Sequence, residues 1–92
     1  MQRPTGMAEH IHTFQRPLTR RGQAWTVEAW GEELEGGRWE GWIVFGPVDG
    51  GPLVATGRET TQSTRAALGY WARGLEEIYL DGALARAVGR AA

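Results

Sequence analysis

Few residues of this chain could carry chemistry, and the first group precedes a segment with helical periodicity. Arg58 is followed closely by Thr60, Thr61, Gln62 and Ser63. The first backbone N–H groups of a helix lack partners inside the helix and attract anions. An arginine with several hydroxyls would suit a phosphate or carboxylate there, but the same residue types are typical of helix capping. We therefore expect a capped helix start, with a weak anion-binding site as the alternative.

The two histidines could begin a metal site. His10 and His12 lie two residues apart, so on a regular strand they point to the same side. Zinc needs three or four ligands, the nearest carboxylate is Glu9, and the sequence contains no cysteine. We expect a pair of surface histidines, with no metal and no other cofactor.

The sequence contains enough carboxylates for acid–base catalysis, but they show no catalytic arrangement. Glu32, Glu33 and Glu35 cluster near a glycine pair, where they are expected to solvate a turn. There is no cysteine nucleophile, and no serine, histidine and aspartate fall into the arrangement of a catalytic triad. The sequence therefore predicts a protein that is not an enzyme.

Alternating side chains predict an antiparallel sheet in the first two thirds of the chain. Strands are expected over residues 24–33, 38–45 and 53–59, separated by turns that contain glycine pairs. Residues 10–18 are expected to form a fourth strand at the edge, or an extended arm, because proline is confined to strand edges and ends. Residues 1–9 are polar and are predicted to be a disordered leader.

Charge and pattern together predict the register of the first two firm strands. A strict two-residue turn would place Glu33 opposite Glu40, an unfavourable pair. A loop with an odd number of residues avoids this pair, although it brings Glu32 opposite Glu40 on the outer face. It gathers one apolar face, whose expected members are Trp25, Val27, Ala29, Trp39, Ile43, Phe45, Leu53 and Ala55.

The last third of the chain is predicted to be helical. Ser63 is the expected N-cap, Gly89 the expected C-cap, and a break is expected at Asp81-Gly82. An apolar stripe at spacings of three and four is expected to cover the apolar face of the sheet, and consists of Leu68, Trp71, Leu75 and Ile78. The predicted architecture is α+β, with an antiparallel meander packed on one helix or two consecutive helices.

The second face of the predicted sheet is the main clue to function. It is expected to carry Trp30, Trp42, Val44 and Val54. One helical layer cannot cover both faces, so either residues 10–18 fold over this face or it is exposed. An exposed patch with two tryptophans would indicate a partner, and self-association as a homodimer is the leading hypothesis.

Single-stranded nucleic acid is the second class of partner for this face. Arginines interleaved with aromatic residues could stack bases, here Arg38 and Arg58 beside the two tryptophans. However, Glu28, Glu32 and Glu40 share the face. The net charge of −1, from ten arginines against eleven acidic residues, also lacks the basic excess that duplex-DNA binders show. We therefore place nucleic acid below a protein partner.

Several short motifs resemble a set of small uncharacterised bacterial proteins that has no established activity. They are Trp39-Glu40-Gly41-Trp42, Arg58-Glu59-Thr60-Thr61-Gln62, Tyr70-Trp71-Ala72, Gly74-Leu75 and Tyr79-Leu80-Asp81-Gly82-Ala83-Leu84. The resemblance covers roughly residues 10–88 and implies a stand-alone bacterial protein of about this length. It assigns no functional residue.

Length and hydropathy predict one domain without a membrane span. Ninety-two residues suffice for one modest core, which we place at residues 10–90. No stretch approaches 18 apolar residues, and the first twelve residues lack the apolar core of a signal peptide. The protein is expected to be cytoplasmic.

Overall fold

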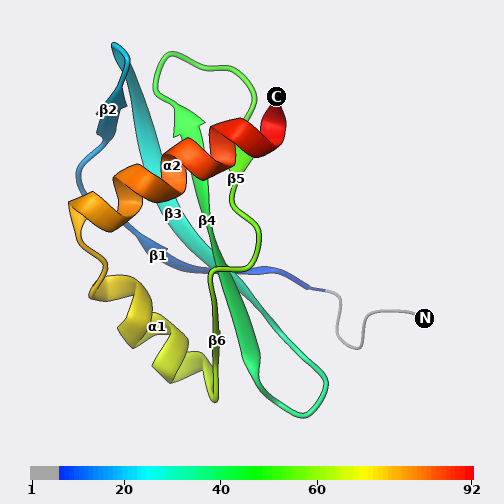
Figure 1. Cartoon of the computed structure of the whole chain (residues 1–92). Coiled ribbons are helices and arrows are strands. Elements are labelled where there is room, and N and C mark those ends of the chain that lie inside the picture. Colours follow the sequence, from blue (N-terminus) through cyan, green and yellow to red (C-terminus); the bar gives the residue numbers. More distant parts are fainter. Residues whose placement is uncertain (1–6) are drawn as a thin grey trace.

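A computed structural model describes residues 7–92, and it shows one antiparallel sheet followed by two helices (Figure 1). Four strands lie in the order β1-β3-β4-β5, while β2 also pairs with β3 and β6 also pairs with β4. The predicted α+β class is therefore confirmed. The strands are β1 (Glu9–Thr13), β2 (Leu18–Arg20), β3 (Gln23–Glu33), β4 (Trp39–Pro47), β5 (Val54–Ala55) and β6 (Thr60–Gln62), and the helices are α1 (Arg65–Arg73) and α2 (Glu77–Ala91).

The long hairpin β3–β4 forms the centre of the sheet, and its predicted register is confirmed. Ala29 pairs with Ile43, and Glu32 pairs with Glu40. Gly36 and Gly37 have φ angles of 90° and 88°, which residues with a side chain rarely adopt. The glycine pair therefore permits the odd-length loop, which was inferred from avoiding Glu33 opposite Glu40 and from gathering one apolar face.

The core lies between one face of the sheet and the two helices, which both cross the same side of the sheet (Figure 1). Ile43, Phe45 and Leu68 are fully buried. On α2 the buried residues are Leu80, Ala83, Leu84 and Ala87. No helix of residues 7–92 is long and apolar enough to span a membrane.

The helical break lies earlier than predicted. Gly74 ends α1 and α2 begins after Glu76, so Gly82 and Gly89 lie inside α2 instead of at a break and a C-cap. Because α2 starts anew at Glu77, its apolar side is not in line with that of α1. Ile78 is therefore 82% exposed, and its predicted place in the core is wrong. A glycine inside a helix costs up to about 1 kcal/mol, and the buried alanines and leucines of α2 offset that cost.

The start of α1 is capped by Thr64 and not by Ser63. The Thr64 hydroxyl accepts a hydrogen bond from the backbone N–H of Ala67 at 3.0 Å, the usual N-cap geometry. Four hydroxyl residues precede the helix, and the sequence pattern alone does not distinguish neighbouring candidates.

The N-terminal arm extends the sheet and does not fold over its second face. β1 pairs with β3 at the edge, and Ile11, Phe14 and Leu18 all pack against the core. Of the predicted leader, residues 1–6 lie outside the described part of the chain, and Glu9 already belongs to β1, opposite Gly31.

The predicted strand over residues 53–59 is divided into β5 and β6. Thr56 and Glu59 still bond to β4, since the N–H of Thr56 donates to Ile43 and that of Glu59 donates to Gly41. Two more residues lie between β5 and β6 than a continuous strand would need there. The chain therefore departs from a regular strand opposite Trp42, and Arg58 is exposed in this bend.

Candidate functional site

The face of the sheet opposite the helices, which we call the outer face, brings the predicted tryptophan pair together. Trp30 and Trp42 are directly opposite each other on β3 and β4, and both are half-buried. Both helices lie on the other side of the sheet, and no helix or strand of residues 7–92 lies across this pair (Figure 1). The site residues predicted on β3 and β4 therefore share one face.

Trp30 is held in place by its neighbours on this face. Its indole N–H donates to the Glu28 carboxylate at 2.9 Å. The His10 ring meets Trp30 edge-on with 5.7 Å between the ring centres, and His10 Nε2 lies 2.7 Å from the Thr13 hydroxyl. An aromatic side chain ordered in this way loses little conformational freedom when a partner covers it.

The apolar part of the outer face continues onto β5, with a different membership from the one predicted. Val44 is opposite Ala55, while Val54 is opposite Phe45 and packs on the core. The prediction that Val54 lies on the outer face is therefore wrong by one residue. Leu53 takes that side instead: it is 68% exposed, and its Cδ2 would lie 3.0 Å from a Cβ placed on Gly46.

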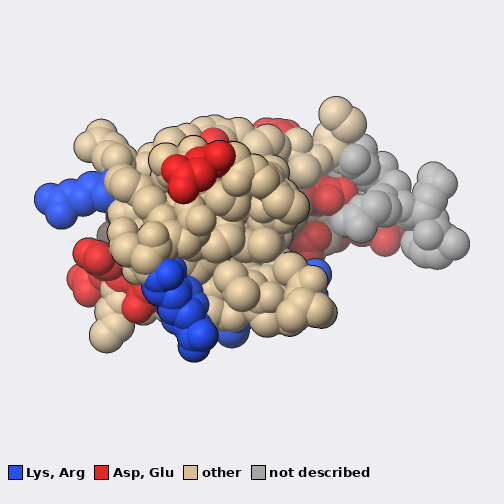
Figure 2. Space-filling model, turned by 90° about the horizontal axis from the view of Figure 1, so that it is seen from above, with Lys and Arg blue, Asp and Glu red and all other residues tan. Residues whose placement is uncertain are grey.

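The outer face also carries charge, which is unevenly distributed over its strands. Glu28 and Glu32 lie on β3, where Glu32 is only 7% exposed, and Glu40 lies on β4 opposite Glu32. Figure 2 looks onto the end of the molecule and not onto the outer face, and the described residues of that end present both signs of charge without a continuous basic surface. A nucleic-acid backbone would meet carboxylates beside the tryptophans.

The residues predicted to form an anion site are not brought together. Thr60 is opposite Gly41 on the core side of the sheet, whereas Thr61 is opposite Glu40 on the outer face. The Gln62 side-chain amide donates to the Thr60 hydroxyl at 2.6 Å. Ser63 is exposed ahead of the helix cap. These hydroxyls are distributed over both faces and do not converge on one point.

The two histidines lie on opposite faces of the sheet. The register of β1 against β3 shifts between them, so His10 is opposite Trp30 and His12 is opposite Ala29. Burial, followed by the positive charge of Arg73, lowers the pKa of His12 below its ordinary value of 6.5. Residues 7–92 contain no group of three potential metal ligands.

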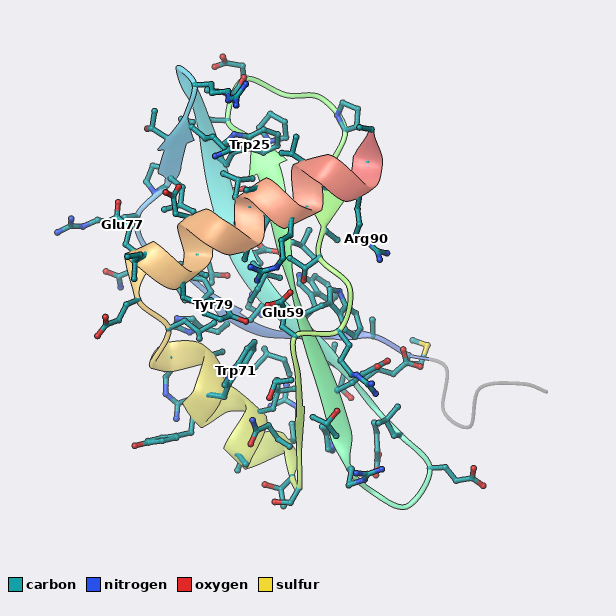
Figure 3. All side chains as sticks on the ribbon, viewed as in Figure 1. Trp25, Glu59, Trp71, Glu77, Tyr79 and Arg90 are labelled. Carbon is teal, nitrogen blue, oxygen red and sulfur yellow. The ribbon has the colours of Figure 1, made fainter. Side chains whose placement is uncertain are left out.

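Sequence reasoning missed a polar cluster between α2 and the strand segment before β6. The Tyr79 hydroxyl donates a short hydrogen bond to the Glu59 carboxylate, and Arg86 donates to the same oxygen at 2.6 Å. Figure 3 shows Tyr79 and Glu59 pointing toward each other, with Trp71 beside them. Burial and the bond to Glu59 raise the pKa of Tyr79 to about 12. The cluster joins α2 to the sheet, and its carboxylate is already satisfied.

An open groove of about 400 Å³ lies beside the start of α2. It is lined by the β1–β2 connection from Phe14 to Leu18 and by Glu77 and Leu80 of α2. Its two charged residues, Arg16 and Glu77, are of opposite sign and exposed. The groove therefore lacks the convergent polar groups that typify a small-molecule site.

Comparison with known proteins gives no relative from which to transfer a function. No family model, curated protein or solved structure matches the chain. The resemblance to small bacterial proteins therefore stays a prediction, and the functional argument rests on the outer face alone.

Proposed function

We propose that this protein is a small interaction module that self-associates through the outer face. The observation that carries the proposal is the cross-strand pair of Trp30 and Trp42, half-buried on the face opposite the helices. Val44, Ala55 and the exposed Leu53 continue this surface onto β5. Exposed apolar patches of this kind are typical of protein interfaces, where tryptophan is enriched.

The organisation of Trp30 supports the proposal. Its hydrogen bond to Glu28 and its edge contact with His10 hold the indole ring ready for a partner. The N-terminal arm packs at the sheet edge and on the core, so its described residues do not compete for the surface. A second copy of the chain would cover both tryptophans at once.

Sedimentation at micromolar concentrations tests this function. We expect a concentration-dependent dimer, and we expect Trp42→Ala to weaken it, because truncating a central interface tryptophan costs about 2 kcal/mol or more. Tyr70→Ala is the matched control, since Tyr70 is a 77% exposed aromatic residue on α1, away from this face. A protein that stays monomeric throughout, or a dimer that Trp42→Ala does not change, contradicts the proposal.

Single-stranded nucleic acid is the competing class of partner, since open sheet faces with aromatic residues can stack bases. Glu28 and Glu40, which are partly exposed, weigh against it because they would repel phosphates. A fluorescent oligonucleotide at low salt separates the two classes, since binding to the phosphate backbone is strongest there. Salt-sensitive binding that Trp42→Ala abolishes would favour nucleic acid over a protein partner.

A further inference from the structure

The groove beside the start of α2 has an apolar floor and one charge of each sign at its rim. Leu18 of β2 and Leu80 of α2 line the groove and are each 5% exposed, so they form its floor. The half-buried Phe14 lines it as well. The exposed Arg16 and Glu77 form the rim, and Figure 3 shows Glu77 at the start of α2 beside the β1–β2 connection.

The two rim charges are not neutralised by other described residues. Within residues 7–92, Arg16 and Glu77 take part in neither an ion pair nor a side-chain hydrogen bond. A partner that brings an acidic group to Arg16 and a basic group to Glu77 would be complementary to both. Complementarity of this kind selects the right partner against wrong ones, since like charges brought together are unfavourable.

β2 adds an open backbone edge next to the groove. Thr19 of β2 is opposite Ala24, whose C=O accepts a hydrogen bond from Val48 on the other side of β3. Antiparallel strands alternate between residue pairs that exchange hydrogen bonds and pairs that do not. The N–H and C=O of Thr19 therefore point away from β3, toward the side of β2 on which the described residues place no strand.

An extended peptide segment would suit the edge, the floor and the rim together. Side chains two positions apart in an extended chain point to the same side. An apolar side chain can therefore enter the groove while an acidic and a basic residue, two positions before and after it, face the rim. In strand addition, backbone hydrogen bonds supply affinity, and pockets for alternate side chains supply specificity.

The described part of this chain does not itself offer such a segment. Within three residues of each exposed large apolar residue, the charged neighbours are all acidic, all arginine or absent. These exposed residues are Met7, Val48, Leu53, Tyr70, Ile78 and Val88. A second copy is therefore not complementary to the groove in the way that its rim requires.

We infer that the groove binds an extended segment of a different protein, in which an apolar residue lies between an acidic and a basic residue. The segment lies along the free edge of β2, its apolar side chain enters the groove, and its charged residues pair with Arg16 and Glu77. This inference goes beyond the proposed self-association, because it concerns a different surface of the molecule.

Three capped pentapeptides test the inference, each with a central leucine, glycine on both sides of it and a charged residue at each end. The mixed peptide carries aspartate and lysine, the acidic peptide two aspartates and the basic peptide two lysines. In NMR titrations, we expect the mixed peptide to shift the amide signals of residues 14–19 and 77–80. It should bind about threefold more tightly than the other two, as for exposed charge pairs. Glycine in place of its leucine should weaken binding about tenfold.

Charge reversal at the rim gives the sharper test. Arg16→Glu makes both rim charges negative, so this variant should prefer the basic peptide. Glu77→Arg makes both positive and should prefer the acidic peptide. Arg38→Glu is the control, because Arg38 is an exposed arginine between β3 and β4 that does not line the groove. It should keep the preference of the wild type for the mixed peptide.

The outcomes that overturn the inference are distinct from those that overturn the proposed function. Unshifted groove signals at millimolar concentrations of all three peptides, or an unchanged preference in Arg16→Glu, contradict the peptide site. Shifts at Trp30 and Trp42 in place of the groove contradict it too, because the peptide then lies on the outer face. Groove signals that move with protein concentration alone, and no longer do so in Arg16→Glu, would identify a second copy as the occupant. Sedimentation of Arg16→Glu should match the wild type, so self-association stands or falls separately.

Discussion

Gly31 of β3 and Gly41 of β4 lie directly opposite each other on the core face of the sheet, and Leu68 of α1 occupies the space above them. A Cβ on Gly41 would lie 2.5 Å from Leu68 Cδ1, and a Cβ on Gly31 would collide with Leu68 Cδ2. The pair of glycines thus makes a notch that allows α1 to approach the hairpin. This contact helps to hold α1 on the face opposite the tryptophan pair.

Filling the notch should destabilise the protein. We expect Gly41→Ala to lower the free energy of unfolding by about 1–3 kcal/mol, the range for overpacking a core, as measured by urea unfolding. Gly89→Ala is the control, because a Cβ there meets nothing within 4 Å and alanine favours a helix by up to about 1 kcal/mol over glycine. Equal stability of Gly41→Ala and the wild type would show that Leu68 moves aside freely.

The cap of α1 can be tested by a pair of neighbouring substitutions. Thr64→Ala should lower the free energy of unfolding by about 1 kcal/mol, because the N–H of Ala67 loses its acceptor. Ser63→Ala should change it by less than about 0.5 kcal/mol, as for an ordinary surface substitution. Thermal unfolding of both variants gives the comparison, and a larger loss for Ser63→Ala would return the cap to the residue that the sequence favoured.

The bond between Tyr79 and Glu59 should make stability fall at alkaline pH. The pKa of Tyr79 is raised from 10.0 to about 12, so its contribution is complete below pH 10 and is lost as the pH rises toward 12. We expect the urea midpoint to fall over this range, and to fall less in Tyr79→Phe. Tyr70→Phe removes the hydroxyl of an exposed tyrosine. Its urea midpoint should fall with pH as much as that of the wild type. If the urea midpoints of Tyr79→Phe and the wild type fell in parallel with rising pH, the alkaline loss of stability would not come from the bond between Tyr79 and Glu59.

The central hairpin was predictable because its constraints are local. Two glycines in sequence, the cost of facing Glu33 with Glu40, and strict alternation together leave one register that pairs Ala29 with Ile43. The same reasoning placed Trp30 and Trp42 on one face. Each of these inferences uses residues that are close in sequence or joined by one short turn.

Predictions that depended on longer connections were less accurate. Val54 lies on the core face and Leu53 on the outer face, the reverse of the prediction. The loop after β4 decides which residues of β5 face the core, and alternation alone fits either choice. The helical break falls after Gly74 because Tyr79 must reach Glu59 and the leucines of α2 must reach the core. The apolar spacing around Ile78 continues across that break and so gave no sign of it.

By itself, the sequence determined the α+β class, the hairpin register and the presence of two tryptophans on a common sheet face, since backbone periodicity and turn chemistry decide these locally. Only the tertiary structure decided that the face is left open by residues 7–92. That outcome depends on where β1 pairs and on where Ile11 and Phe14 pack, and the sequence left both open. The long-range packing of Leu68 into its glycine notch and of Ile11 and Phe14 onto the core settles them.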